Sequence, residues 1–203
     1  MTYAAADQLS RRLSADGKGV TGASVDEAIA GALLAADEEI ENYCGRVFTD
    51  AGSASARTFR PPPATDDVLL VDDFWTTTGL AVAVDADGDG VFETSWTLGT
   101  HYQLEPLNAP DVFYRIRPIG SLLWPAPTRA GRAAVQVTAR WGWEDVPASV
   151  TEAALIIAAK LVKMREAPFG VVGWGDYGAL RVRDIPEVRT LLNRYVRGDQ
   201  LGF

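Results

Sequence analysis

The stretch AVQVTARWGWEDVPASVTEAALIIAAKLVKMRE, residues 134–166, decides the fold of this chain. In its first part, Ala134–Trp141, apolar and polar residues alternate, and this period of two is typical of a half-buried strand. Val135, Val137 and Ala139 would then share the buried face of that strand. Glycine follows the strand directly, so the stretch predicts a strand that ends sharply before a second, different element.

The second element of this stretch is a predicted helix. Val146-Pro147 restricts the backbone to an extended approach, and Ser149 with Glu152 fits a capping box. Apolar residues then recur at helical spacing: Val150, Ala153, Ala154, Ile157, Ala158, Leu161 and Met164, widened by Leu155, Ile156, Ala159 and Val162. An apolar surface this broad must be covered on more than one side, by the same domain or by a neighbouring subunit.

Earlier in the chain, a second long helix is predicted from Val25 to about Cys44. Ser24 and Glu27 fit another capping box. One face of this helix would carry Ile29, Ala32, Leu33, Ala36, Ile40 and Tyr43. Its alanines permit close packing, so we expect it to pack against the helix of residues 150–164. A shorter helix is predicted over residues 3–14.

The region between the two long helices, residues 57–141, reads as β-structure. Glycine, proline and aspartate separate seven short strand candidates: Arg57–Pro61, Val68–Val71, Leu80–Asp85, Val91–Thr97, His101–Leu104, Val112–Arg117 and Ala134–Trp141. The predicted fold is therefore α+β, a small helical bundle with a β-rich insertion. Its segments are N-terminal helices (1–56), the insertion (57–141), the core helix with a glycine-rich loop (142–183), and a C-terminal docking helix and tail (184–203).

Composition limits the class of protein. The 203 residues are 47% hydrophobic and 23% charged, as in ordinary globular proteins. One cysteine precludes an intrachain disulfide and favours a reducing compartment, and neither a signal peptide nor a membrane-spanning segment is apparent. The net charge of −8 is uneven, because residues 1–110 carry six basic and 18 acidic side chains. Such an acidic half argues against tight nucleic-acid binding, which needs Lys and Arg at phosphates.

Two phrases of the sequence resemble one known family. The first is Trp141-Gly142-Trp143, then Val-Pro, then an alanine-rich helix with Lys-Met-Arg near its end; the second is ADEEIENYCGRVF, residues 36–48. In this order they resemble the head–tail connector (adaptor) proteins of tailed bacteriophages and phage-like gene transfer particles. The resemblance covers most of the chain.

The resemblance implies a structural virion protein of the neck, assembled in the cytoplasm of the bacterial host. It implies a twelvefold ring below the portal protein, with a central channel through which DNA passes without specific binding. It also implies contact with the portal on one side and with the next tail-ward protein, a stopper or tail terminator, on the other. An acidic channel wall would repel DNA and let it slide. No membrane partner is expected.

The C-terminal segment is the portal-facing part in that family. Here Asp184 could cap a last helix, whose basic side would be Arg189, Arg194 and Arg197, and the tail ends with Leu201 and Phe203. Together with Trp174 in the glycine-rich loop 168–179, these are the candidate partner-binding residues. With few apolar residues of its own, this segment is expected to become ordered on docking. The alternative is that the last helix folds back onto its own domain.

One motif suggests a metal. Asp85, Asp87 and Asp89, followed by Gly90, repeat the first half of a calcium-binding loop, and Glu93 falls at position 9 of that loop. Position 12, where such loops carry a bidentate Glu, is Trp96, and strands flank the loop in place of helices. The alternative is an acidic hairpin tip, in which Asp and Gly serve turn geometry. Ca²⁺ is therefore the only cofactor considered.

Catalysis finds little support in the sequence. The single histidine, His101, lies in a strand pattern, and Cys44 has no evident histidine partner. We therefore expect no enzymatic activity, and Cys44 is expected to pack as a small buried apolar residue. Alternatives to the connector are a calcium-binding β-rich module of a non-viral or secreted protein, another phage tail or neck component, and a hydrolase domain of a phage particle.

Overall fold

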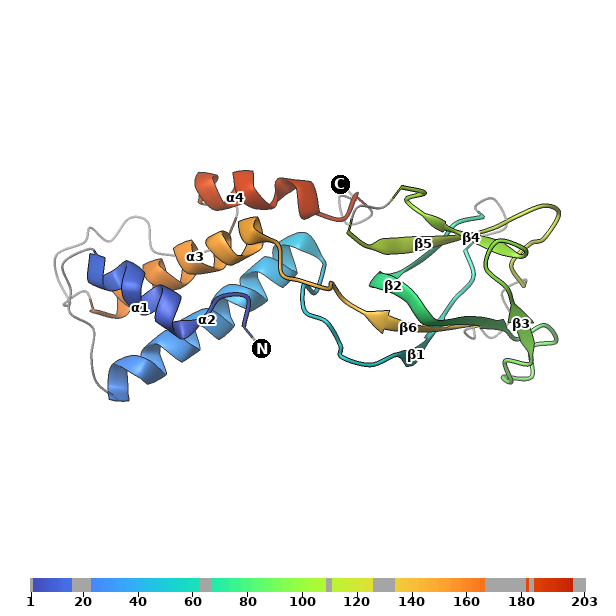
Figure 1. Ribbon diagram of the computed structural model, residues 1–203, viewed down its shortest axis with the longest axis horizontal. Helices are drawn as coiled ribbons and strands as arrows, with labels where there is room; N and C mark the ends of the chain where they lie inside the picture. Colours follow the sequence, from blue (N-terminus) through green and yellow to red (C-terminus); the bar gives the residue numbers. More distant parts are fainter. Residues whose placement is uncertain are drawn as a thin grey trace. The chain divides into compact units, whose positions relative to one another are not determined.

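The computed structural model describes residues 2–15, 23–62, 67–108, 111–125, 134–166, 182 and 185–198 (Figure 1). The chain is α+β and divides into two compact units. The helical unit comprises Met1–Phe48 and Val146–Phe203, and the sheet unit comprises Thr49–Asp145. The β-rich region of residues 57–141 thus falls inside the sheet unit.

The helical unit contains the helices α1 (Ala6–Ala15), α2 (Ala23–Cys44), α3 (Ala148–Glu166) and α4 (Pro186–Leu192), and then a 3-10 turn, η2 (Asn193–Tyr195). As expected, α2 packs against α3, and α1 contacts both of these helices. Small side chains make the close approach possible, since Ala36 on α2 and Ala154 and Ala158 on α3 have no exposed surface. The predicted burial of Cys44 is also confirmed.

Both long helices begin before their predicted caps. The N–H of Thr151 donates to the carbonyl of Pro147, so Ser149 lies within the first turn of α3. The capping box predicted for Ser149 and Glu152 is therefore wrong, and Glu152 accepts a hydrogen bond from Arg12 of α1 at 2.7 Å. Likewise, α2 begins at Ala23, one residue before the predicted cap Ser24.

The N-terminal residues are fastened to α2 by a polar network. The backbone N–H of Tyr3 donates to Asp37 Oδ2 at 3.1 Å, and its hydroxyl donates to Glu41 Oε1 at 2.6 Å. The same hydroxyl accepts the backbone N–H of Phe48 at 3.0 Å. Burial raises the pKa of Asp37 to about 6. The backbone hydrogen bond from Tyr3 acts in the opposite direction and lowers this pKa. The unit therefore encloses a carboxyl group that ionises less readily than an exposed one.

The sheet unit is built on one antiparallel sheet with the strand order β1-β6-β2-β5-β4, and β3 pairs with β2 off this path. The strands are β1 (Ser55–Phe59), β2 (Leu69–Val84), β3 (Thr94–Trp96), β4 (Tyr102–Glu105), β5 (Phe113–Pro118) and β6 (Val135–Trp141). As predicted, alternate residues of β6 are buried, with Val135, Val137 and Ala139 facing the core. This core also holds Phe74 and Trp141, whose rings meet edge to face at 6.0 Å.

One strand was predicted as two. The candidates Val68–Val71 and Leu80–Asp85 are the ends of a single 16-residue strand, β2. The aspartates and glycine between these candidates, Asp72, Asp73 and Gly79, predict a break in the strand. The strand absorbs it through register shifts against β6, and Gly79 adopts a positive φ of 77°.

Among the described residues, no helix is long and apolar enough to cross a membrane.

Candidate functional site

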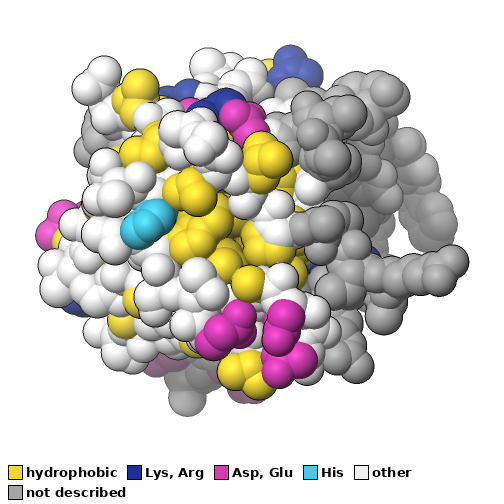
Figure 2. All heavy atoms as spheres, turned by 90° about the vertical axis from the view of Figure 1, so that its right-hand side faces the viewer, with side chains coloured by type: hydrophobic (Ala, Val, Ile, Leu, Met, Phe, Trp, Pro, Cys, Tyr) yellow, Lys and Arg dark blue, Asp and Glu magenta, His cyan; other side chains and the backbone are white. Residues whose placement is uncertain are grey.

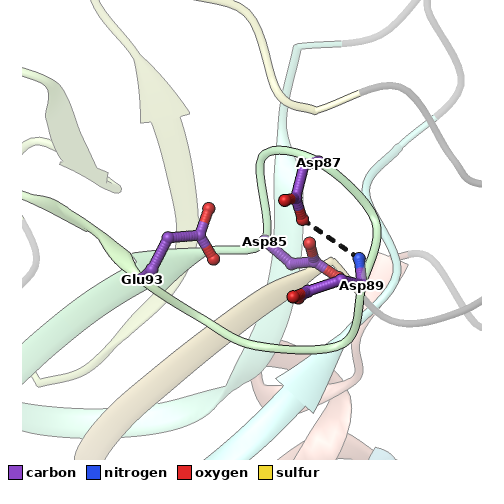
Figure 3. Close-up of side chains that lie close together, drawn as sticks. All are labelled: Asp85, Asp87, Asp89 and Glu93. Carbon is purple, nitrogen blue, oxygen red and sulfur yellow. Dashed lines mark hydrogen bonds between the residues drawn. The ribbon is translucent and has the colours of Figure 1, made fainter.

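The connection between β2 and β3 brings together the four acidic residues predicted as metal ligands. One oxygen from each of Asp85, Asp87, Asp89 and Glu93 lies within 4.8 Å of the others (Figure 3). Asp85 is buried and the other three are exposed. We call residues 85–93 the acidic loop.

Backbone hydrogen bonds hold the loop in this shape. Asp85 accepts the N–H groups of Gly88 at 2.6 Å and Gly90 at 2.9 Å, one on each carboxylate oxygen. Both glycines adopt a positive φ, 83° and 97°, which L side chains rarely tolerate. Asp87 accepts the N–H of Asp89 in the same way. The aspartates therefore define the turn, as the hairpin-tip interpretation requires, and also converge, as the calcium interpretation requires.

The loop has no basic partner within the described part of the chain. None of its four carboxylates lies within 4.0 Å of a described Lys or Arg nitrogen. By contrast, Arg57, Arg117 and Arg140 of the same unit each pair with a carboxylate outside the loop. The loop thus concentrates uncompensated negative charge, which a divalent cation or the basic side chains of a partner could neutralise.

Trp96, three residues after the acidic loop in the chain, belongs to an aromatic cluster whose stacking the sequence did not predict. The rings of Trp96 and Trp124 stack at 4.8 Å with an interplanar angle of 14°, and His101 stacks on Trp96 at 6.4 Å. Both tryptophans are partly buried and pack against the core of the sheet unit. Trp96 occupies position 12 of the calcium-loop pattern. Its side chain belongs to this aromatic stack and supplies no metal ligand.

Apolar side chains next to these aromatic residues in the chain are left exposed. Leu98 is 41% exposed, Leu122 37% and Leu123 78%. Figure 2 shows hydrophobic side chains gathered beside the single histidine, with acidic side chains on the same face. We call Trp96, Leu98, His101, Leu122, Leu123 and Trp124 the tip patch. Its sequence signal was weak, because Trp96 and Trp124 belong to separate segments and only the fold makes them neighbours.

The C-terminal candidates are partly described. Arg189 and Arg194 are exposed, and Arg197 is half-buried. For residues 185–198, the structure agrees with the alternative, in which the last helix folds back onto its own domain. Val188 and Leu192 are fully buried and α4 packs against α3. The helix N-cap is Ile185 in place of the predicted Asp184. Asp184, Trp174, Leu201 and Phe203 lie outside the described residues.

Long-range contacts explain why this segment folds back. The ring of Tyr195 meets Phe48 edge to face at 5.5 Å. The Tyr43 hydroxyl donates to Asn193 Oδ1 at 2.7 Å, and the N–H of Arg197 donates to the carbonyl of Cys44 at 3.0 Å.

The two residues weighed for catalysis have other contacts. His101 Nδ1 accepts the N–H of Thr97 at 2.8 Å, which uses the imidazole to close the turn before β4. Cys44 is fully buried, and burial raises the pKa of its thiol to about 12, so the unreactive protonated form is favoured.

Comparison with known proteins gives a structural likeness alone. No family model matches the chain, and no curated protein matches it. Among solved structures, a chain in the neck of an empty gene transfer agent particle, computed with C6 symmetry, is 22% identical, with a TM-score of 0.55. A chain in the virion of the native gene transfer agent particle is 20% identical, with the same TM-score. Each match covers 98% of this chain and 91% of the other, so the α+β fold is shared over nearly the full length.

Proposed function

We propose that this chain is a structural component of the neck of a phage-like particle, a head–tail connector. The observation that carries the proposal is the fold likeness to a neck chain over 98% of this chain and 91% of that one. A likeness of this extent includes both units, and not only a widespread β-module. The phrases Ala36–Phe48 and Trp141–Trp143 independently resemble the connector family.

In this role the chain forms a twelvefold ring below the portal and surrounds the channel through which DNA enters the tail. The acidic net charge of −8 suits a channel that must not retain DNA, because like charges repel the phosphates. No covalent step is needed, so the function is mechanical and the protein is not an enzyme. The chain is incorporated into particles in the host cytoplasm.

The portal-side contact is assigned to the C-terminal segment. Arg189 on α4 and Arg194 on η2 offer exposed positive charge on a segment already packed onto its unit, and the half-buried Arg197 follows them in the chain. Leu201, Phe203 and Trp174 would fill apolar sites on the portal. The next tail-ward protein, a stopper or tail terminator, binds the opposite side of the ring.

The test is removal of the gene from a strain that produces the particles. The expected result is heads that have packaged DNA but carry no tails, restored by the intact gene on a plasmid. Normal tailed particles without this protein would overturn the proposal. Mass spectrometry of purified particles should also detect the chain, and negative-stain images of the bare heads distinguish a connector from another tail or neck component.

A second candidate is a calcium-binding β-rich module of a non-viral or secreted protein. The convergence of four carboxylates within 4.8 Å favours it. Under this alternative, Ca²⁺ would raise the melting temperature, but loss of the gene would leave particle assembly intact.

A further inference from the structure

The tip patch combines a rigid base with exposed apolar side chains. Trp96 and Trp124 are fixed by stacking on each other at 4.8 Å and by packing on the core. The indole N–H of Trp124 also donates to the carbonyl of Asp67 at 2.8 Å. Rigid aromatic anchors lose little conformational entropy on binding, and for this reason they dominate many protein interfaces. Leu123, next to this base in the chain, is 78% exposed.

The adjoining charge restricts what can cover this patch. The acidic loop places Asp87, Asp89 and Glu93 at the surface with no described Lys or Arg within 4.0 Å. Nucleic acid and anionic lipid surfaces would be repelled by these carboxylates. A basic side chain, in contrast, could pair with a carboxylate and lie over an indole face.

A second copy of the sheet unit is a poor match for the same reason. In an isologous contact, its acidic loop would face another acidic loop, and three of its arginines, at positions 57, 117 and 140, are engaged with its own carboxylates.

We propose that the tip patch and the acidic loop together form a docking surface for a different protein, whose contacting segment presents an apolar side chain flanked by Lys or Arg. The apolar side chain covers Leu123 and the tryptophan stack, and the basic side chains meet Asp87 and Asp89. This inference rests on the proposed function only for the source of the partner, another protein of the same particle. It adds an interaction surface on the sheet unit to the portal contact assigned to the helical unit.

The first experiment identifies the partner by its chemistry. A photo-reactive benzoylphenylalanine replaces Leu123 in the full chain, in cells that produce particles, and a matched chain carries it at Leu34 of α2, which is 60% exposed. Position 123 should form a cross-link to a different particle protein, at a peptide with an apolar residue beside Lys or Arg. Position 34 should not form this cross-link. A cross-link to another copy, to nucleic acid, to lipid or to a peptide without basic residues overturns the proposal, as does no cross-link.

Failure of this inference is distinguishable from failure of the proposed function. If purified particles contain the chain but position 123 forms no such cross-link, only the docking surface is wrong. If particles lack the chain, the connector function is wrong. In that case, a cross-link from position 123 to a basic segment of another protein in the same cells would still support the docking surface.

The second experiment tests the two halves of the surface with the purified partner. Binding is measured in a chelator, so that a bound cation does not contribute. Leu123→Asp, and separately Asp87→Lys with Asp89→Lys, should each weaken binding about tenfold or more. Asp26→Lys with Glu27→Lys makes the same charge change at exposed positions of α2 and should leave binding within about twofold.

The charge reversal has a reciprocal prediction. Replacing the cross-linked partner's basic residue by Glu should weaken binding to the natural chain and restore binding to the doubly Lys-substituted chain. Unchanged affinity of the folded Leu123→Asp chain overturns the proposal by itself, and this exposed substitution does not depend on the loop's ability to fold without its aspartates.

Discussion

Gly142 lies directly against the backbone of Thr49: a β-carbon built on Gly142 would come within 1.8 Å of the Thr49 carbonyl oxygen. Gly142 also adopts a φ of +96°, which L side chains rarely adopt. Both partners are backbone atoms, so no side chain can move aside. Gly142→Ala should therefore destabilise the sheet unit by about 2 kcal/mol or more, the sum of backbone strain and steric overlap. Urea unfolding followed by tryptophan fluorescence measures this loss.

The control for this prediction is Gly31→Ala. Gly31 lies within α2, and a β-carbon there would meet nothing within 4 Å. Because alanine is the better helix former, this change should stabilise the chain by up to about 1 kcal/mol. Equal free energies of unfolding for the two variants would show that the backbone at Gly142 and Thr49 can move apart to admit a β-carbon.

The second prediction concerns the packing of α2 on α3. Ala158 on α3 is fully buried, and a tryptophan there would have to displace neighbouring side chains. Ala158→Trp should cost about 1–3 kcal/mol of unfolding free energy or more. Lys160→Trp, at an exposed position of the same helix, is the control and should change stability by less than about 0.5 kcal/mol. Similar melting temperatures for both variants would contradict the packing.

These helices and β6 were predictable because their patterns are local. The alternation that buries Val135, Val137 and Ala139 is visible within seven residues. The hydrogen bonds that shape the acidic loop, from Gly88 and Gly90 to Asp85, are equally local. In contrast, the packing of Tyr195 on Phe48 depends on contacts between distant segments. No local pattern shows that α4 has a surface to cover.

The same reason explains the errors in the sheet unit. Gly79 was expected to separate two strands, but pairing with β6 resumes at Ala81 after a register shift and keeps Gly79 within β2. Tertiary pairing therefore overrode local preference. The stack of Trp96 on Trp124 was missed because its two rings come from segments that only the fold makes neighbours.

The third prediction concerns pH. Burial raises the pKa of Asp37 from 3.8 to about 6, so the folded state binds this proton more tightly than the unfolded chain does. The contribution of protonated Asp37 to the free energy of unfolding is therefore fully present below about pH 4 and is lost as the pH rises through about 6. Asp37→Asn removes the titration but can still accept the N–H of Tyr3. It should flatten the dependence of the urea midpoint on pH between about 4 and 7.

Asp50 provides an internal contrast to Asp37. A hydrogen bond from Arg140 is the main cause that lowers the pKa of Asp50 to about 2. Its contribution to stability is present above about pH 4 and is lost as the pH falls toward 2. Asp50→Asn should therefore leave the slope between pH 4 and 7 unchanged. If Asp37→Asn leaves that slope unchanged as well, Asp37 is not the group that titrates.

The fourth prediction concerns calcium at the acidic loop. If the converging oxygens of Asp85, Asp87, Asp89 and Glu93 bind Ca²⁺, millimolar Ca²⁺ should raise the melting temperature by mass action. Asp87→Ala should abolish the rise, whereas Asp26→Ala, a matched change at an exposed position of α2, should retain it. Identical melting curves in Ca²⁺ and in chelator would leave the hairpin-tip interpretation for this loop.

The fifth prediction concerns docking by the C-terminal segment. Because Arg189 on α4 and Arg194 on η2 are exposed in a segment that is already packed, their replacement should not disturb the fold. We expect Arg189→Glu with Arg194→Glu to keep its helical content by circular dichroism but to yield DNA-filled heads without tails. Deletion of residues 201–203 should have the same effect, because the apolar end of the tail is assigned to the same portal contact.

The control must carry the same change of charge elsewhere on the helical unit. Arg11→Glu with Lys160→Glu alters exposed positions of α1 and α3, where the Arg11–Asp7 pair at 3.1 Å is a surface ion pair of little energetic weight. These particles should be tailed at the natural yield. If the charge reversal on α4 and η2 also gives tailed particles at that yield, the basic side chains of these two elements are not the portal contact. The search for that contact would then turn to the loop that carries Trp174.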